Sequence, residues 1–305
     1  MSGYPDNQVV VGIDGSACAL DAARWAAGAA VRRRAELTLL LAYDVSVGFA
    51  GPGVMIAPDV YTDVRHWAQQ VLTDAAEAIR AQFPELTVST LLRRGNAARV
   101  LIEATGSALL TVLGSHGDSE WTEAVLGSVA ARVAAHGRGP VVVLRDVAAD
   151  NPSNRPVWVG VEGSDLDAAP LAFALQEASL RQACLVPLHC WGEEPGVIDV
   201  PYYSSEAADQ RRQEREQRLL AEQLTGWADK YPDVPVLPTL LHGHPATQIL
   251  HRYQQVPLDA RPSLIVVGSR GRSAIAGLLL GSTSHTLIAH SPCPVAVVRT
   301  RPDRP

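Results

Sequence analysis

Lysine is almost absent from this chain, because Lys230 is the only one of its 26 basic residues that is not arginine. Lys230 lies in a charged stretch that we predict to be helical, so the Gly-Lys-Ser/Thr sequence of a P-loop nucleotide site is missing. Acidic residues outnumber basic ones by 32 to 26, which gives a formal net charge of −6 at pH 7. Nucleic acids and anionic membranes are normally bound by basic surfaces, so we expect neither as a partner.

Cysteine is scarce too, and long apolar runs are lacking. The four cysteines form no Cys-x-x-Cys pair, so we expect reduced, mostly buried thiols rather than disulfides or metal ligands. The histidines show no ligand spacing with other Cys, Asp or Glu residues, and no metal site is predicted. No apolar run approaches the roughly 18 residues of a membrane span, and the N-terminus is short and polar. We therefore predict a cytoplasmic protein.

An internal repeat organises the chain. Residues 9–16, Val-Val-Val-Gly-Ile-Asp-Gly-Ser, match residues 157–164, Val-Trp-Val-Gly-Val-Glu-Gly-Ser, at an offset of 148. Further on the offset becomes 154, so the second copy has six additional residues, most simply within 253–263. A repeat of this length predicts two domains, 1–148 and 156–305, joined by a linker at 149–155.

Each copy alternates short β-branched runs with amphipathic segments, which indicates an α/β domain built on a doubly wound parallel sheet. Gly- and Pro-rich segments at 44–61 and 191–205 predict long surface loops. The mixed charges of 211–218 favour a solvated helix face over a nucleic-acid patch. In the first copy we expect strands at 9–14, 37–43, 87–93, 108–114 and 141–145, and helices at 17–34, 60–82, 97–105 and 126–135.

A glycine-rich loop, Gly-x-x-Gly, nine residues, Gly-Ser, occurs once in each copy, at 114–128 and 268–282. In open α/β sheets ligands bind beyond the carboxyl ends of the strands where strand order reverses. Glycines let backbone N–H groups approach a ligand there, and the following helix start attracts phosphate. Asp14 and Glu162, at the ends of the first strands, can accept hydrogen bonds from a nucleoside. The sequence therefore predicts two adenine-nucleotide sites.

With these motifs, the chain resembles the universal stress proteins of the ATP-binding type, in their tandem form similar to stress- and dormancy-associated proteins of actinobacteria. The resemblance implies Rossmann-like domains of the adenine nucleotide α-hydrolase type and ATP as ligand, with AMP or ADP as alternatives and Mg²⁺ possible alongside ATP. It assigns to the first site Gly12, Asp14, Ala42, Gly114, Ser115, His116, Gly117, Gly127, Ser128 and Val129. It assigns to the second site Gly160, Glu162, Cys190, Gly268, Ser269, Arg270, Gly271, Arg272, Gly281, Ser282 and Thr283.

The two copies depart from the motif at opposite ends. Copy one has Asp118 and Glu120 after its loop, where copy two has Arg272, so like-charge repulsion would weaken phosphate binding in copy one. The alternative is that these carboxylates face water without effect. Copy two has Glu162 where the motif has aspartate, and the longer side chain would misalign a hydrogen bond to the nucleoside. We predict two unequal sites.

No catalytic residue is predicted, because no Ser-His-Asp or Cys-His set and no Gly-x-Ser-x-Gly elbow is present. We expect at most slow ATP hydrolysis. The resemblance implies a nucleotide-dependent stress or dormancy regulator read by another protein, with a nucleotide-free scaffold, a nucleotidyl-transferring enzyme or a weak ATPase as alternatives. The short apolar strands 141–145 and 295–299 predict a homodimer, unless each is an interior strand.

Overall fold

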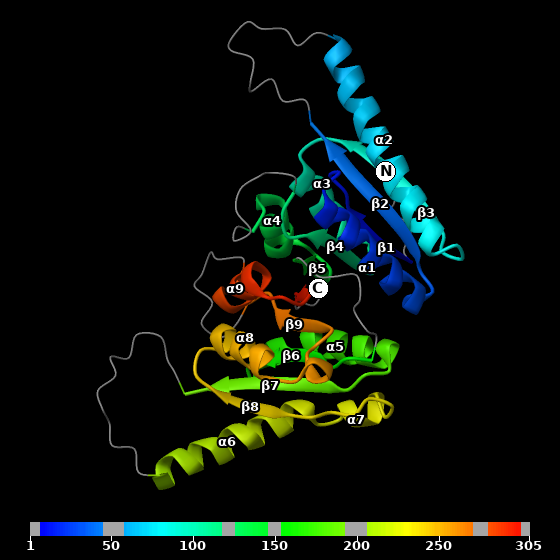
Figure 1. Ribbon diagram of the computed structural model, residues 1–305. Coiled ribbons are helices and arrows are strands. Elements are labelled where there is room, and N and C mark those ends of the chain that lie inside the picture. Colours follow the sequence, from blue (N-terminus) through cyan, green and yellow to red (C-terminus); the bar gives the residue numbers. More distant parts are fainter. Residues whose placement is uncertain are drawn as a thin grey trace, which may run out of the picture. The chain divides into compact units, whose positions relative to one another are not determined.

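The computed structural model of the chain describes residues 7–44, 58–117, 126–145, 154–192, 206–270 and 280–299. The chain divides into two compact units, residues 1–150 and 151–305, called unit 1 and unit 2 below. Within each unit, a sheet is flanked by helices, as Figure 1 shows. The predicted linker 149–155 lies largely outside the described residues.

Unit 1 contains five strands and four helices among its described residues. The strands are β1 (Gln8–Gly12), β2 (Glu36–Tyr43), β3 (Val88–Arg94), β4 (Leu110–Gly114) and β5 (Val141–Leu144). The helices are α1 (Ala17–Arg33), α2 (Pro58–Gln82), α3 (Ala97–Ala104) and α4 (Ser128–His136).

The strands of unit 1 form one parallel sheet in the order β3-β2-β1-β4-β5. The chain moves outward from β1 to β3 and then crosses to β4 on the other side of β1. Helices α1 and α2 contact each other, as do α3 and α4. Because parallel crossovers are right-handed, the two pairs cover opposite faces. The reversal of strand order lies between β1 and β4, and this confirms the predicted doubly wound sheet.

Unit 2 repeats this topology in the order β8-β7-β6-β9-β10, again with parallel pairs. The six additional residues of the second copy fall where η3 precedes β9. Its strands are β6 (Val157–Val161), β7 (Leu185–Trp191), β8 (Thr239–His242), β9 (Leu264–Gly268) and β10 (Val295–Val298). Its helices are η2 (Asp165–Asp167), α5 (Ala168–Arg181), α6 (Glu206–Leu224), α7 (Trp227–Lys230), α8 (Pro245–Gln255), η3 (Leu258–Ala260) and α9 (Ser282–His290).

The strands are near-continuous apolar runs because helices cover both faces of each sheet. Val9, Val10 and Val11 of β1 have no exposed surface, and Val157 and Val159 of β6 have none either. Burying such runs on both faces supplies the main driving force for each unit.

The C-terminal end of the first helix is repeated in the second copy, whereas its start is not, because η2 precedes α5. Ser16 caps α1, and its side chain accepts a hydrogen bond from the Ala19 N–H at 3.1 Å. At the other end, Arg34 has φ 52°, and Gln182, its equivalent after α5, has the same value. Left-handed residues are a common way to end a helix, although glycine usually takes the position. The two copies therefore share backbone detail that their side chains do not reveal.

The predicted boundaries differ from the observed ones by a few residues. The predicted strand at 108–114 begins at Leu110, because the Ala108 N–H continues the α3 turn by donating to Ala104. The predicted helix at 126–135 begins at Ser128, because Gly127 has extended backbone and acts as the N-cap. The loop predicted at 44–61 is too long, since α2 begins at Pro58. Most of that loop and of 191–205 lies outside the described residues.

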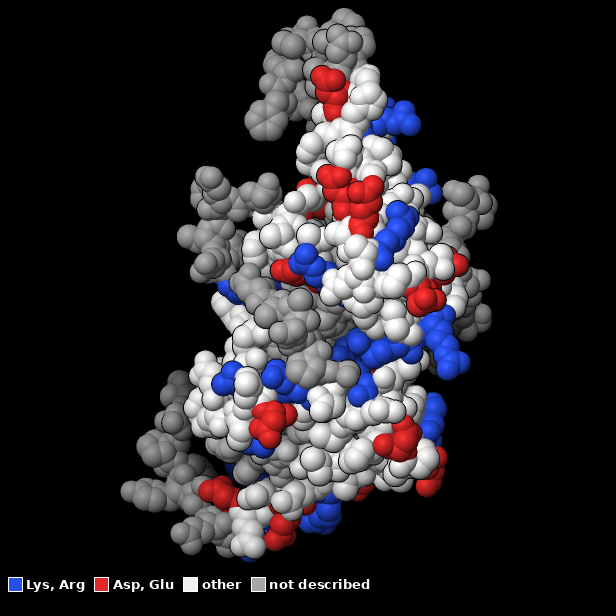
Figure 2. All heavy atoms as spheres, turned by 45° about the vertical axis from the view of Figure 1, so that its right-hand side comes forward, with Lys and Arg blue, Asp and Glu red and all other residues white. Residues whose placement is uncertain are grey.

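Surface charges are mixed. Figure 2 shows acidic and basic side chains close together over much of the face drawn. Residues 211–215 of α6 are exposed and carry charges of both signs, as expected for a solvated face, whereas Glu216 is half-buried. In the part of the chain that the structure describes, no helix combines the length and apolarity needed to cross a membrane.

Candidate functional site

Asp14 follows β1 and faces the glycine loop of unit 1. Its Oδ1 atom accepts hydrogen bonds from Ser16, at 3.0 Å from the backbone nitrogen and 2.6 Å from the hydroxyl. A Cβ atom added to Gly117 would lie only 2.6 Å from the Oδ2 atom of Asp14, so this oxygen lies directly against the loop. The side chain is exposed on its outer side. One carboxylate oxygen thus binds Ser16 at the start of α1, while the other lies against the loop after β4. The ends of β1 and β4 therefore lie side by side, as the sequence predicts.

The glycine loop closes on itself at its second end. The Gly127 N–H donates to the Ser115 carbonyl at 2.6 Å, and a Cβ on Gly127 would lie 2.9 Å from that same oxygen. Contacts this short exclude a side chain, so Gly127 is needed for the close approach of two backbone segments. The loop between them holds residues 118–125, including Asp118 and Glu120, which lie outside the described residues.

Helix α4 starts at the mouth of this loop without a side-chain cap. Its first residue, Ser128, is exposed and the next, Val129, is half-buried. Backbone N–H groups in the first turn of a helix have no partner within the helix. Such N–H groups, with the positive end of the helix dipole, attract phosphate oxygens. The arrangement can therefore hold a nucleotide with its phosphates at α4 and its nucleoside near Asp14.

Ser115 and His116 have different orientations. Ser115 is 3% exposed, and its N–H donates to Leu144 at 2.7 Å, so it anchors the loop to β5. Its hydroxyl lies 2.9 Å from His116 Nδ1, and the imidazole is half-buried. Ser115 therefore supports the loop from below, whereas His116 is the polar side chain of this pair that reaches the surface.

Two other predicted glycines allow close packing. A Cβ on Gly12 would lie 2.6 Å from Leu113 Cδ2, and one on Gly114 would lie 2.8 Å from Cys18 Sγ. Both positions bring a helix or a neighbouring strand against the strand ends. Gly160, the equivalent of Gly12, has more room, since its Cβ would lie 3.5 Å from the nearest atom.

The glycine loop of unit 2 has the same frame. The Gly281 N–H donates to the Ser269 carbonyl at 2.8 Å, and the Ser269 N–H donates to Val298 at 2.9 Å. Ser282 and Thr283 form the first turn of α9, whose N-cap Gly281 has no side-chain hydrogen bond. The Ser284 hydroxyl donates to the Gly268 carbonyl at 2.6 Å and ties α9 to β9. Gly271 and Arg272 lie outside the described residues.

Positive charge gathers at this end of unit 2. Arg270 is exposed in the loop after β9, and Arg299 follows β10, the neighbouring strand. Burial, and after it the positive charge of Arg270, lowers the pKa of Arg299 from its ordinary value of 12.5. At the corresponding places of unit 1 stand His116 and Arg145. The phosphate end of unit 2 is thus the more cationic of the two.

The loop after β6 differs sharply from the loop after β1. Asp167 is 4% exposed, and its carboxylate accepts hydrogen bonds from the N–H groups of three successive residues, Glu162, Gly163 and Ser164, at 2.7 to 3.1 Å. Successive N–H groups of this kind form an anion-binding nest. In unit 1 the equivalent of Asp167 is Ala19, which has no carboxylate. The N–H groups after β6 therefore have an acceptor from the chain itself that is missing at the same position after β1.

Ala42 and Cys190 occupy equivalent, half-buried positions near the ends of β2 and β7. Burial raises the pKa of the Cys190 thiol from 9.0 to about 12. The thiol is therefore neutral at ordinary pH and behaves as a small packing group.

His189 is a residue whose role sequence reasoning missed. It is buried in β7, and its ring nitrogens lie 2.8 Å from the Val161 carbonyl and 2.8 Å from Glu216 Oε2 on α6. It therefore connects α6 to the residue before Glu162. Leu41, its equivalent in unit 1, has no polar group, and this difference between the copies was the only signal in the sequence.

In the described part of the chain, no group of three or more His, Cys, Asp or Glu side chains could hold a metal ion.

Comparison with known proteins covers the whole chain. The model of the universal stress protein family matches residues 7–145 and again residues 153–299. The chain is 34% identical over 310 residues to a universal stress protein of Mycobacterium tuberculosis strain H37Rv, with 98% of each chain covered. It is 35% identical over 297 residues to a universal stress protein of Mycolicibacterium smegmatis, with 96% of this chain and 97% of the relative covered.

A solved structure with the same fold is the crystal structure of a universal stress protein from Archaeoglobus fulgidus, with a TM-score of 0.69, 21% identity and 98% of each chain covered. The family match falls on both units, and the curated relatives align over nearly the full length of the chain. The chain belongs to the universal stress protein family and contains two of its domains.

Proposed function

We propose that this chain binds ATP in the crevice between the glycine loop and the first strand end of each unit, and that occupancy is read by another protein. The observation that carries the proposal is the meeting of Gly117 with Asp14 Oδ2, beside a loop closed by the Gly127 to Ser115 hydrogen bond. The first turn of α4 supplies backbone N–H donors and Asp14 supplies a carboxylate acceptor beside the same loop, which suits a nucleotide.

Each group has a role in this proposal. The first turn of α4 or α9 holds the phosphates, with Arg270 adding charge in unit 2. Asp14 or Glu162 receives hydrogen bonds from the nucleoside, while Ala42 and Cys190 leave room for the base. Any Mg²⁺ would be held mainly by the phosphates, since no described acidic cluster offers it a site. AMP and ADP fit the same groups with fewer phosphate contacts.

The two sites are unequal in this proposal. Unit 1 has the shorter Asp14, whose carboxylate touches its loop, and so favours the nucleoside end. Unit 2 has Arg270 and Arg299 at its phosphate end, and so favours phosphate. Titrating Asp118→Arg and Glu162→Asp variants tests this directly, because each should bind nucleotide more tightly than the wild type.

We propose a regulatory role with at most slow hydrolysis, because the sequence contains no Ser-His-Asp or Cys-His set and no Gly-x-Ser-x-Gly elbow. We further propose a cytoplasmic homodimer that pairs through the terminal strands β5, β10 or both. Both strands are short and consist only of apolar residues. Sedimentation of the intact chain tests the dimer, and a single species of 32.5 kDa would contradict it.

Ligand release from freshly purified protein tests nucleotide binding. The protein is denatured, and the supernatant is separated by anion-exchange chromatography, where ATP, ADP and AMP elute apart. A stoichiometric ATP peak supports the proposal. An empty supernatant, together with no binding of added ATP in a titration, would show a nucleotide-free scaffold instead. Steady release of phosphate from added ATP would favour the weak ATPase.

A further inference from the structure

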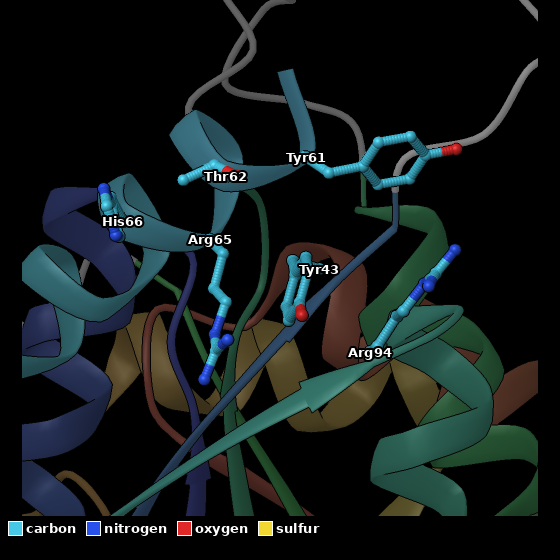
Figure 3. Close-up of a pocket in the computed structure, with 6 residues that line it drawn as sticks. All are labelled: Tyr43, Tyr61, Thr62, Arg65, His66 and Arg94. Atoms are coloured by element: carbon cyan, nitrogen blue, oxygen red, sulfur yellow. The ribbon is translucent and has the colours of Figure 1, made fainter. Parts of the chain in front are cut away.

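A basic cavity of about 260 Å³ opens in unit 1 at the ends of β2 and β3, under the first turns of α2. In Figure 3, Arg65 points from α2 toward Tyr43, and Arg94 rises from β3 toward Tyr61. His66 lies on the far side of Arg65 in this view. The residues that line the cavity are Tyr43, Tyr61, Thr62, Arg65, His66 and Arg94.

This cavity lies apart from the glycine loop. It sits over β2 and β3, whereas the loop follows β4, and β1 lies between β2 and β4. Neighbouring strands are about 4.8 Å apart, so the cavity is roughly 10 to 14 Å from the end of β4. None of the residues predicted for the nucleotide site lines it.

The lining carries positive charge without a carboxylate. Arg65 and Arg94 are exposed, and neither forms an ion pair with any residue that the structure describes. Asp44 follows Tyr43 in the chain but does not line the cavity. Two guanidinium groups and an imidazole thus line one cavity, and in Figure 3 the Tyr43 ring lies between the two arginines.

Arg94 lies over an aromatic ring. Its guanidinium carbon lies 5.3 Å from the centroid of the Tyr61 ring. Tyr43 pairs with Arg94 across the two strands, so a second aromatic side chain stands next to it. Stacking on an aromatic face leaves the N–H edge of a guanidinium free to donate. Less side-chain entropy is then lost when an anion binds.

Unit 2 shows that the fold does not require this basic set. Trp191 and His242 take the places of Tyr43 and Arg94, and their rings pack edge to face with centroids 4.9 Å apart. The positions of Tyr61, Arg65 and His66 are taken by Asp209, Gln213 and Glu214. A basic pocket in one copy has thus become an aromatic contact with acidic neighbours in the other.

We propose that the cavity of unit 1 is a binding site for a small phosphate group, either free phosphate or a compact phosphate monoester. Two planar guanidinium forks match a tetrahedral dianion with three oxygens better than a carboxylate with two. The Tyr43 and Tyr61 hydroxyls and Thr62 are further polar groups on the rim. This proposal does not depend on nucleotide binding, although Tyr43 follows Ala42, which the proposed function places near the base.

The test uses the full chain saturated with ATP, so that the glycine loops are filled, and titrates it by calorimetry with inorganic phosphate or glycerol 3-phosphate. We expect one phosphate site per chain, weakened at least tenfold by Arg65→Gln/Arg94→Gln, because each charged hydrogen bond contributes about a factor of ten. The matched control Arg211→Gln/Arg215→Gln removes the same charge from exposed positions of α6 and should leave binding unchanged. Tighter binding of glycerol 3-phosphate than of phosphate identifies a monoester site, and the reverse identifies a free-phosphate site.

Three results would overturn the proposal. The first is absence of phosphate binding by the wild type, and the second is equal weakening by both double variants, which would reflect general charge. The third is loss of ATP affinity in Arg65→Gln/Arg94→Gln, measured separately, because the cavity would then belong to the nucleotide site. Circular dichroism confirms folding of each variant, and Arg65→Lys/Arg94→Lys should recover part of the affinity since it keeps the charge but loses the forks.

Discussion

Unit 1 and unit 2 have the same strand order, the same strand register and the same left-handed residue after their first helix, yet different carboxylates bind the backbone after their first strands. After β1, Asp14 lies against the glycine loop, whereas after β6 the backbone N–H groups are bound by the buried Asp167. The repeated backbone therefore places the strand ends, while a few side chains determine which polar groups are available there.

A second contrast lies inside the helices that follow these strands. In α5, Arg181 and Glu177 form a buried ion pair at 3.1 Å, with both side chains 1% exposed. In α1 the equivalent Arg33 is half-buried and donates to the Ala29 carbonyl at 3.1 Å, because alanine stands where unit 2 has Glu177. Burial lowers the pKa of Arg181 from 12.5 to about 10. Unit 2 therefore depends on an internal charge pair that unit 1 lacks.

The largest effect is expected from breaking that pair. Glu177→Ala leaves the Arg181 guanidinium buried without its carboxylate, and we expect unit 2 to lose about 3 to 5 kcal/mol of its free energy of unfolding. Urea denaturation of the full chain, followed by tryptophan fluorescence, measures it as a transition at lower urea concentration. The double variant Glu177→Leu/Arg181→Met should recover most of the loss. Equal stability of Glu177→Ala and wild type would contradict the contrast between α5 and α1.

The next effect concerns the two glycine loops. Gly127→Ala places a Cβ 2.9 Å from the Ser115 carbonyl, whereas at Gly281 the nearest atoms would be 3.6 Å away. Gly127 has φ −60° and Gly281 has φ −69°, so the backbone accepts alanine at either position. We expect Gly127→Ala to weaken ATP binding in unit 1 by about a hundredfold through loop displacement.

The matched Gly281→Ala variant should change ATP binding by about twofold at most, as a contact without strain allows. Equilibrium dialysis of both variants against labelled ATP compares them. Similar losses in both, or a larger loss for Gly281→Ala, would show that the two loops are not distinguished by their packing.

A smaller effect is expected from Asp167→Ala. The N–H groups of residues 162–164 lose their shared acceptor, which should lower the stability of unit 2 by about 1 to 3 kcal/mol. Hydrogen exchange at these amides, measured by mass spectrometry, should accelerate locally, while the loop after β1 serves as the internal reference. Unchanged exchange at 162–164 would mean that the carboxylate does not hold the loop.

The smallest effect is a pH dependence of the stability of unit 2 that arises from Cys190. Unit 1 lacks it, because Ala42 stands at the equivalent position. Because the pKa of Cys190 is raised from 9.0 to about 12, the folded protein binds more protons than the unfolded chain between these values. The stabilisation is complete below about pH 9 and is lost as the pH rises toward 12. Chemical denaturation at a series of pH values should show a flatter profile for Cys190→Ala. Rapid alkylation of Cys190 at pH 9 would argue against a buried thiol.

Much of the fold could be predicted because its causes are local and repeated. Apolar runs such as Val9–Val11 and Val157–Val159 predict buried parallel strands, and their constant offsets predict two copies of one topology. The glycine loop was predictable for the same reason, since Gly127 and Gly281 stand at equal spacing from Gly114 and Gly268. Helix starts were less accurate, because Gly127 and Pro58 act through backbone geometry that periodicity does not reveal.

The α/β class, the family of the two domains, the strand ends and the chemical types available there could all be predicted from the residues and their spacing. The contact between Asp14 and Gly117, the binding of the loop after β6 by Asp167, and the shared cavity of Arg65 and Arg94 became apparent from the folded chain. Residues far apart in the chain meet in each of these. Spacing predicts contacts within one element, but partners such as His189 and Glu216, 27 residues apart, meet only when crossovers bring their elements together.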